Sequence, residues 1–355
     1  MPSKLICEIV KIGKFDKHPN ANTLSMTQVY NFPAIFRTGE FQEGDKAIYF
    51  PVEAMLPIKP EFAFLWNNKE NPTERNRTIK AKKLRGVFSM GILMPAKLFG
   101  LESLEVGTNV AQILGIFKYE PPEPSNLSGN NKSQPNWFIK YTDIESARKY
   151  SEIFIPGEEV IITEKIHGSN ARFAWINQEV DHDEQPNLWI GSHRLAKQDD
   201  CSNEWSMVAK NLEMKDKLSA FPNLIFFGEI YGKIQAGNGY HYDIKNKVNL
   251  VLFDIFDIIN ARWLNYDNRK QIANTVGFPM VPELYRGPWT SFEEMEKFAD
   301  GTTILGKYTH NREGCVIRPT AECWNEKIGR VILKIHGKEF LINDKAVQYF
   351  DEIQE

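Results

Sequence analysis

A polar, proline-rich stretch in the first half of the chain constrains the fold more than any other feature. Residues 119–137 include the run Glu-Pro-Pro-Glu-Pro-Ser-Asn-Leu-Ser-Gly-Asn-Asn. A segment of this composition cannot bury enough apolar surface to pack as a helix or strand, so it reads as a linker. At 355 residues, two domains are also the default. We therefore expect one domain at residues 1–118, a linker at 119–137 and a second domain at 138–355.

The segment before the linker has the pattern of a small β-barrel. Strand-like runs such as residues 5–10 and 46–50 alternate with Gly, Pro and Asn turns. Residues 18–24, His-Pro-Asn-Ala-Asn-Thr-Leu, resemble a motif of OB-fold tRNA-binding modules, and Gly-Asp-Lys at 44–46 fits their later turn. This resemblance implies an OB-like β-barrel that binds nucleic acid.

Charge is divided unevenly between the two parts of the chain. Residues 1–118 hold 16 Lys and Arg against 11 Asp and Glu, whereas the rest holds 27 against 35. This asymmetry suggests that the first domain meets a polyanion and that the second holds metal ions. The densest basic stretch, residues 75–85, has six cations and no acid. Such a run is often only a solvated surface. On this kind of barrel it predicts contacts with a nucleic-acid backbone, made by Arg75, Arg77, Lys80, Lys82, Lys83 and Arg85, with Trp66 and Phe88 as flanking side chains that could stack on bases.

Strands and helices alternate after the linker, which indicates a mixed α/β (α+β) domain. Residues 159–163 and 171–175 read as short strands, and we expect a hairpin-like turn between them. Residues 202–220 have a helical pattern, and residues 291–298 open like a capped helix.

Residues 249–258 form an almost continuous apolar strand that is interrupted by Asp254 and Asp257. A buried carboxylate costs several kcal/mol unless it is paired or hydrogen-bonded, so both residues need partners. A nucleotide pocket or a structural arginine would serve equally well.

The run Glu-Lys-Ile-His-Gly-Ser-Asn at residues 164–170 is the strongest candidate for chemistry. It places the amine of Lys165 on a tight loop, and Gly168 permits the close backbone approach that a nucleotide phosphate needs. Lys-x-x-Gly alone is a weak signal, because most matches are ordinary surface turns. Four further segments follow in order: Phe-Phe-Gly-Glu-Ile-Tyr-Gly at 226–232, Leu-Phe-Asp-Ile at 252–255, Glu-Gly-Cys-Val-Ile-Arg-Pro at 313–319 and Ile-Leu-Lys-Ile-His at 332–336.

This ordered set resembles the covalent nucleotidyltransferases, which include the ATP-dependent polynucleotide ligases and the mRNA capping enzymes. Within that group, the lysine motif is most similar to the nick-sealing RNA ligases of the phage type. Residues 141–145, Tyr-Thr-Asp-Ile-Glu, also resemble the segment that these ligases carry ahead of the nucleophile. The resemblance covers about residues 138–340 and implies an ATP-grasp-like adenylyltransferase domain of antiparallel sheets with helices.

The resemblance implies a role for each matching residue. Lys165 is the adenylated nucleophile, and Glu164 presents adenine through its backbone. Asn170 holds the ribose or the waters of the metal, and Arg194 contacts the sugar and the polynucleotide end. Glu229 contacts the ribose hydroxyl, Phe253 stacks on adenine with Asp254 behind it, Glu313 coordinates the metal, and Lys334 reaches the α-phosphate.

The chemistry explains why a metal is expected. A lysine attacks phosphorus only as the neutral amine, yet an ordinary lysine is almost fully protonated at neutral pH. A divalent cation nearby would lower the pKa of the amine. Glu313 and Glu229 are the best-supported carboxylates for holding Mg²⁺ or Mn²⁺.

Two positions depart from the family pattern. The last motif usually reads Lys-x-Lys, but this chain has Lys334-Ile335-His336, with Lys338 two residues later. Either His336 donates a hydrogen bond to the triphosphate, or Lys338 reaches in. Before Arg194, the intervening His193 breaks the usual order. His167 is expected only to shape the turn, since a lone histidine is weak evidence for acid–base work.

These observations predict an ATP-dependent RNA ligase that seals 3′-hydroxyl and 5′-phosphate ends, at nicks or bridged ends, through lysyl-AMP and RNA-adenylate. An accessory module ahead of the motifs is similar to a smaller group of RNA ligases with an amino-terminal OB domain. The first alternative is another enzyme of the superfamily, a DNA ligase or a capping enzyme. The second is an OB-fold RNA-binding protein whose transferase domain is inactive.

Bulk properties are those of a soluble intracellular protein. No apolar run reaches the roughly 18 residues needed to cross a bilayer, and the amino terminus does not resemble a signal peptide. The four cysteines lack Cys-x-x-Cys spacing, so neither a zinc site nor a disulfide framework is indicated. We expect a cytoplasmic monomer with no obligate protein partner.

Overall fold

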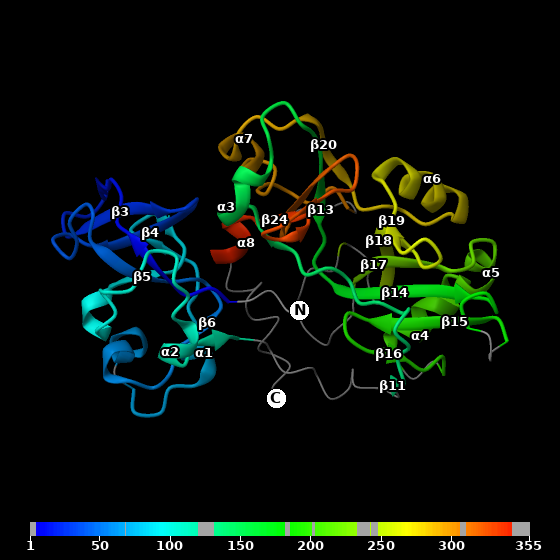
Figure 1. Ribbon diagram of the computed structural model, residues 1–355, viewed down its shortest axis with the longest axis horizontal. Helices are drawn as coiled ribbons and strands as arrows, with labels where there is room; N and C mark the ends of the chain where they lie inside the picture. The colour runs from blue at the N-terminus through cyan, green and yellow to red at the C-terminus, as the bar shows by residue number, and fades with distance from the viewer. Residues whose placement is uncertain are drawn as a thin grey trace. The chain divides into compact units, whose positions relative to one another are not determined.

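The chain divides into two compact units, Met1–Pro121 and Pro122–Glu355. A computed structural model describes residues 5–67, 69–119, 131–181, 185–200, 203–232, 242, 248–305 and 310–342. Both units combine mostly antiparallel sheets with short helices (Figure 1). The predicted mixed α/β fold is therefore confirmed. None of the helices in the described parts of the chain is long and apolar enough to cross a bilayer.

The first unit is built from short strands around two apolar clusters. Strands β1, β5 and β9 form one sheet, and β2, β3 and β4 form another. Val10, Phe36, Tyr49 and Leu93 are in one cluster, and Ile48, Phe50 and Trp66 are in the second. The elements are β1 Glu8–Lys11, β2 Asp16–Lys17, β3 Leu24–Val29, β4 Phe32–Arg37, β5 Lys46–Phe50, β6 Ala54–Met55, η1 Pro60–Trp66, α1 Glu74–Arg77, β7 Lys82–Leu84, β8 Val87–Ser89, β9 Ile92–Pro95, η2 Ala96–Phe99, α2 Ala111–Leu114 and β10 Phe117–Lys118.

The motif at residues 18–24 has a structural role in this unit. His18 is buried, and its Nε2 lies 3.1 Å from the carbonyl oxygen of Leu84. Asn20 donates from its side chain to the carbonyl oxygen of Arg85 at 2.9 Å. The motif therefore fixes the turn of the β7–β8 hairpin.

The second unit contains a seven-stranded sheet and a five-stranded sheet. The strand orders are β11-β16-β15-β14-β17-β18-β19 and β12-β24-β21-β13-β20. Its elements are β11 Asn131–Lys132, β12 Glu145–Ser146, α3 Ala147–Tyr150, η4 Ser151–Ile153, β13 Glu159–Lys165, β14 Ser169–Ile176, β15 Asn187–Ser192, β16 Ala196–Lys197, α4 Glu204–Asn211, α5 Met214–Ser219, β17 Leu224–Gly232, β18 Val248–Asp257, β19 Arg262–Trp263, α6 Tyr266–Val276, β20 Glu283–Pro288, α7 Phe292–Glu296, β21 Gly314–Pro319, β22 Trp324–Asn325, β23 Gly329–Arg330, β24 Leu333–His336 and α8 Lys338–Ile342.

Three apolar layers position the two sheets. Helices α4, α5 and α6 pack through residues such as Trp205, Leu218 and Val276 on one face of the seven-stranded sheet. The other face of that sheet meets the five-stranded sheet at contacts that include Phe227 and Val316. The far side of the five-stranded sheet is covered by α3 and α7.

The expected hairpin around Lys165 is wrong. The strands occur where expected, but β13 pairs with β20 and β21, whereas β14 pairs with β15 and β17. Residues 166–168 thus carry the chain from one sheet to the other. Lys165 is the last residue of a strand of the five-stranded sheet.

Two other predicted elements also differ in detail. The helix expected at 202–220 is two helices, because Glu213 between α4 and α5 has a left-handed backbone with φ of 54°. Residues 120–130 of the expected linker lie outside the described residues, but Asn131–Lys132 is already a strand, paired with β16. Arg172 of β14 donates to Phe138 and Gln134 at 2.8 and 2.6 Å, which anchors this segment to the second unit.

Candidate active site

Strand pairing brings Lys165 and Glu313 into contact. Lys165 stands opposite Gly314 in the β13–β21 register, and Glu313 directly precedes Gly314. The Nζ of Lys165 forms a hydrogen-bonded ion pair with Oε1 of Glu313. The lysine side chain is 26% exposed and the glutamate side chain 11%. The amine is therefore held at a fixed position yet remains open to solvent.

Two histidines complete the surroundings of Glu313. Nδ1 of His167 lies 3.4 Å from Oε2, and Nε2 of His336 lies 3.6 Å from Oε1. Burial alone would raise the pKa of Glu313, but the Lys165 ammonium and the histidine contacts hold that pKa well below its usual range. Burial lowers the pKa of His336, against the opposing effect of Glu313. The carboxylate is thus an anion among several donors.

Glu229 lies on β17, opposite Asn170 of β14. Its burial, opposed by Lys165 and reinforced by Glu313, raises the pKa of Glu229 to about 8. Asn170 has a buried Oδ1 with no hydrogen-bond partner among the described residues. A buried acceptor of this kind costs free energy unless a ligand or water satisfies it. This edge of the site therefore fits a hydroxyl-bearing ligand.

Gly168 is required by the approach of the chain to β17. A Cβ at this position would lie 2.1 Å from the carbonyl oxygen of Ile230 and 3.0 Å from Cγ of Glu229. Any side chain at residue 168 would push the connection between β13 and β14 away from β17. The glycine thereby keeps Lys165 and Glu229 on neighbouring elements close together.

Glu164 points away from solvent and holds a loop. Its carboxylate accepts hydrogen bonds from the Thr303 hydroxyl and from the backbone N–H of Ile304, the latter at 2.8 Å. Its own backbone N–H donates to the carbonyl oxygen of Pro282 at 2.8 Å. The side chain therefore fixes residues 303–304 beside the lysine strand.

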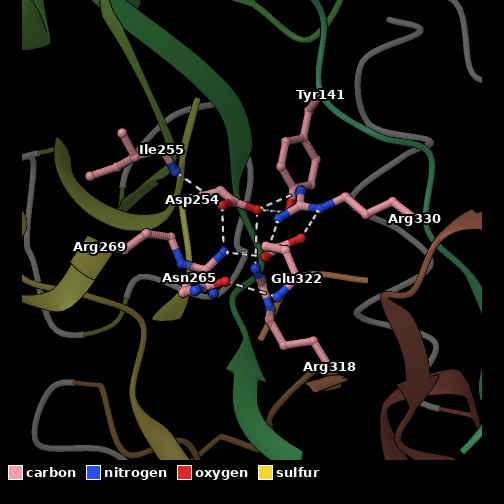
Figure 2. Close-up of polar contacts among 8 residues, drawn as sticks. All are labelled: Tyr141, Asp254, Ile255, Asn265, Arg269, Arg318, Glu322 and Arg330. Carbon is pink, nitrogen blue, oxygen red and sulfur yellow. Dashed lines mark hydrogen bonds and ion pairs between the residues drawn. The ribbon is translucent and has the colours of Figure 1, made fainter. Parts of the chain in front are cut away.

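Asp254 does not face a nucleotide pocket, which corrects its predicted role. Its side chain is fully buried, and its carboxylate is paired with Arg269, Arg318 and Arg330 at 2.6, 3.0 and 2.7 Å. Figure 2 shows these groups converging on it, together with the hydroxyl of Tyr141 at 2.8 Å. Burial would raise the pKa of Asp254, but the three arginines hold it far below its usual range. Of the two alternatives, the structural arginine is the one found.

Phe253 is half-buried beside this cluster. Its ring centroid lies 4.7 Å from that of Tyr141 in an edge-on arrangement. It also packs against the small apolar cluster that contains Ile166, the residue after the lysine. This position is compatible with a ring that covers a base next to Lys165.

The remaining predicted residues lie in and after the last motif, at Lys334, His336 and Lys338, and after β15, at Arg194. Lys334 is half-buried in the middle of β24, opposite Val316. Lys338 instead pairs with Glu296 at 2.9 Å, so the structure favours His336 over Lys338 as the second group of the last motif. Arg194 is exposed after β15, and the neighbouring His193 lies 3.7 Å from Asp143.

His167 is the residue that the sequence reasoning undervalued. Beyond its contact with Glu313, its backbone N–H donates to the hydroxyl of Tyr242 at 2.7 Å. Its place two residues after Lys165 was the available signal, but Glu313 is distant in sequence and reaches it only through the pairing of β13 with β21.

The basic stretch of the first unit is spread over several elements. Arg75 and Arg77 belong to α1, Lys82 and Lys83 to β7, and Arg85 to the turn after it. Trp66 is only 4% exposed and belongs to the core. Its predicted stacking on bases is therefore wrong, since its ring is enclosed by apolar neighbours.

A family model named RNA ligase matches residues 158–336, just over half of the chain. The chain belongs to the RNA ligase family. A model of an OB-fold domain matches residues 6–96, which confirms the predicted barrel of the first unit. No curated protein was found to match the chain.

Solved structures of the Naegleria gruberi RNA ligase share the fold of this RNA ligase. An apo mutant matches with a TM-score of 0.79 and 24% identity, over 96% of this chain and 98% of that chain. A mutant with ATP and Mn matches with a TM-score of 0.79 and 23% identity, over 95% and 98%. The enzyme with PPi matches with a TM-score of 0.78 and 24% identity, over 96% and 98%. The architecture therefore extends over both units.

Proposed function

We propose that this RNA ligase uses ATP and a divalent metal ion to join a 3′-hydroxyl to a 5′-phosphate at nicks in RNA duplexes. The observation that carries the proposal is the contact between Lys165 and Glu313, in a chain of the RNA ligase family. The similar ligase structures that hold ATP and Mn, or PPi, support the choice of nucleotide and metal.

The first step is adenylation of Lys165. The lone pair of Nζ attacks the α-phosphorus, and the bond to the bridging oxygen breaks as pyrophosphate leaves. The Lys165 ammonium must first lose a proton. Glu313 is a poor acceptor for it because the pKa of this carboxyl is held low. Before ATP binds, the ion pair therefore keeps Lys165 charged and positioned.

The carboxylates suit a divalent metal. Mg²⁺ is usually held by one or two carboxylates together with waters and substrate phosphates. Glu313 would supply one such carboxylate as an anion, and Glu229, whose pKa is raised to about 8, would supply the second on losing its proton. No group of three His, Cys, Asp or Glu in the described ranges is arranged as a closed metal site. When bound, the ion supplies positive charge that favours the neutral amine and offsets charge on the phosphates.

The other site residues would recognise the nucleotide. Phe253 would cover adenine, and Glu229 or Asn170 would accept a hydrogen bond from the ribose. Lys334 and His336 would face the phosphates from β24, the strand that they share, and His336 lies next to Glu313. Arg194, exposed at the end of β15, would contact the polynucleotide end.

Two RNA steps follow. The 5′-phosphate oxygen attacks the lysyl-AMP phosphorus, and Lys165 leaves with a proton. The 3′-hydroxyl then attacks the 5′-phosphate, forming the new phosphodiester as AMP leaves. The basic residues of segment 75–85 would contact the RNA backbone during these steps.

Labelled nucleotides and defined nicks test the proposal. Protein is incubated with α-labelled ATP or GTP and Mg²⁺ or Mn²⁺, and then with nicked RNA or nicked DNA. We expect label from ATP on the protein, its transfer to the RNA 5′ end, and its release on sealing. Labelling by GTP would indicate a capping enzyme, sealing of DNA alone a DNA ligase, and no labelling an inactive RNA-binding protein.

A further inference from the structure

The first unit contains a cavity of about 580 Å³. This volume lies within the range typical of small-molecule sites, roughly 300 to 1,000 Å³. Its walls come from β3 and β4, from η1, from the segment between α1 and β7, and from β9. All of these elements belong to one compact unit, so the cavity does not depend on the ligase unit.

The cavity is lined by more cations than acids. Arg37, Arg77, Lys80 and Lys82 line it, against Glu40 and Glu61. Arg37 comes from β4, far from the basic stretch in sequence, and was not predicted from the sequence. An excess of positive charge in a concave site attracts a polyanion.

The basic stretch divides into cavity residues and others. Lys82 and Leu84 line the cavity, while Lys83 between them does not, as expected for alternating side chains on β7. Arg75 and Arg85 are also absent from its walls. Segment 75–85 therefore places Arg77, Lys80 and Lys82 at the cavity and Arg75, Lys83 and Arg85 outside it.

Exposed apolar side chains stand at the same cavity. Phe64 of η1 is 53% exposed and Leu98 of η2 is 52% exposed. An exposed aromatic ring beside cations is the arrangement by which proteins stack a base and hold its phosphate. An acidic peptide would use the cations but not the aromatic face.

Two polar atoms of the walls lack partners. Oε2 of Glu61 and Nε of Arg77 are buried without a hydrogen-bond partner among the described residues. Such atoms are commonly satisfied by a water or a ligand. A nucleotide offers both hydroxyl or amino donors and oxygen acceptors, so it could satisfy an acceptor and a donor of this kind.

We propose that this cavity binds one nucleotide of the RNA strand, with the base against Phe64 and the phosphates against Arg37, Lys80 and Lys82. The inference rests on the proposed function, because it takes RNA as the substrate. It adds a specific binding subsite in the first unit, whereas Lys165 belongs to the second, and this subsite contributes to RNA affinity and not to adenylation.

Two triple variants with equal charge change test the proposal. The cavity variant is Arg37→Gln/Lys80→Gln/Lys82→Gln, and the control is Arg75→Gln/Lys83→Gln/Arg85→Gln. Arg77 is left intact because its Nη1 donates to the carbonyl oxygen of Leu56 at 2.9 Å. Binding of a fluorescent nicked RNA duplex is measured by anisotropy at several salt concentrations. Lys165 adenylation and the melting temperature are recorded for each protein.

The cavity variant should bind RNA at least about tenfold more weakly, with a salt dependence reduced by about one unit for each lost phosphate contact. The control should weaken binding clearly less than the cavity variant, because its residues would contact the RNA backbone only from outside the cavity, and both should adenylate Lys165 normally. Phe64→Ala should weaken binding while leaving the salt dependence unchanged, since it removes stacking alone. Equal effects of the two triple variants, or normal RNA binding by the cavity variant, would overturn the subsite. If the wild-type protein shows no adenylation of Lys165, the proposed function itself is overturned.

Discussion

At the scale of single residues, Glu313 receives contacts from three residues on two segments of the chain. Lys165 ends β13, His167 follows in the crossing between sheets, and His336 ends β24. Its low pKa follows from these donors despite its burial. The carboxyl of Glu313 is therefore already deprotonated, as the proposed metal ligand would need to be.

Replacing Glu313 should impair adenylation through the metal. Glu313→Gln keeps the size of the side chain but removes the charge, so we expect the rate of lysyl-AMP formation to fall about 100-fold or more. The variant should also need more Mn²⁺ than the wild type for half-maximal rate. Glu296→Gln, which alters another paired carboxylate of the same unit, is the control. An unchanged Mn²⁺ requirement would remove Glu313 from the metal site.

The last motif gives a second prediction at this scale. His336 faces Glu313, whereas Lys338 is paired with Glu296. His336→Ala should slow adenylation by roughly tenfold or more, the effect of losing one hydrogen bond to a charged group. Lys338→Ala should leave the rate within about twofold, since its loss disturbs a surface ion pair. The opposite ranking in a single-turnover assay with ATP would show that Lys338 reaches the phosphates.

At the scale of elements, the Asp254 cluster joins the two sheets of the ligase unit. Asp254 comes from β18, Arg318 from β21, Arg330 from β23 and Arg269 from α6, and Figure 2 shows their side chains meeting. Glu322 also accepts from Arg330 at 2.6 and 2.7 Å. Phe253, the neighbour of Asp254, is positioned by the same network.

Removing the charge of Asp254 should destabilise the fold. Asp254→Asn leaves buried arginines without their anion, a change that typically costs about 3–5 kcal/mol. Asp267→Asn breaks an exposed pair with Arg286 and should cost under about 1 kcal/mol. Urea unfolding of both variants at pH 7 measures the difference. Equal free energies of unfolding for the two variants would show that the Asp254 cluster does not stabilise the packing of the two sheets.

The same carboxylate makes stability depend on pH. The folded-state pKa of Asp254 is lowered, so its contribution is present above the ordinary aspartate pKa of about 3.9 and is lost as pH falls further. Between pH 5 and 3, the wild type should therefore lose more stability than Asp254→Asn. Parallel decreases for the two proteins, measured by urea unfolding, would argue against this assignment.

The sequence predicted most elements near the site but not how they pair. Short strand-like runs and one almost continuous apolar run located the strands that became β13, β14 and β18, and Ser291 caps α7 as expected, accepting from the backbone N–H of Glu294. Periodicity carries no information about partners, so the crossing after Lys165 was read as a hairpin. The same limit applies to Asp254, whose arginines lie 15, 64 and 76 residues away in sequence.

At the scale of the whole molecule, the two compact units each have apolar clusters of their own. The ordered motifs of the second unit were sufficient to predict the RNA ligase family. The strand-like runs that alternate with turns in the first unit were sufficient to predict the OB-fold domain. The cavity of the first unit could not be predicted from the sequence, because Arg37, Phe64 and Lys82 are brought together only by folding.

The division into units predicts a division of labour. Deleting residues 1–117 should leave Lys165 adenylation within about threefold of the full chain, because the contacts of Lys165 and Glu313 lie within the second unit. Nick sealing should fall at least about 100-fold, since the basic barrel and its cavity are lost. Full sealing by the truncated protein would assign the first unit another purpose.

The identity of the adenylated residue tests the account most directly. Protein is incubated with ATP and Mn²⁺, digested, and analysed by mass spectrometry. We expect an addition of about 329 Da, the mass of an AMP residue, on the peptide that contains Lys165. Lys165→Ala should carry no adduct, yet still seal RNA supplied with a preformed 5′-adenylate. An adduct that persists in Lys165→Ala, or that maps to another residue in the wild type, would contradict the account.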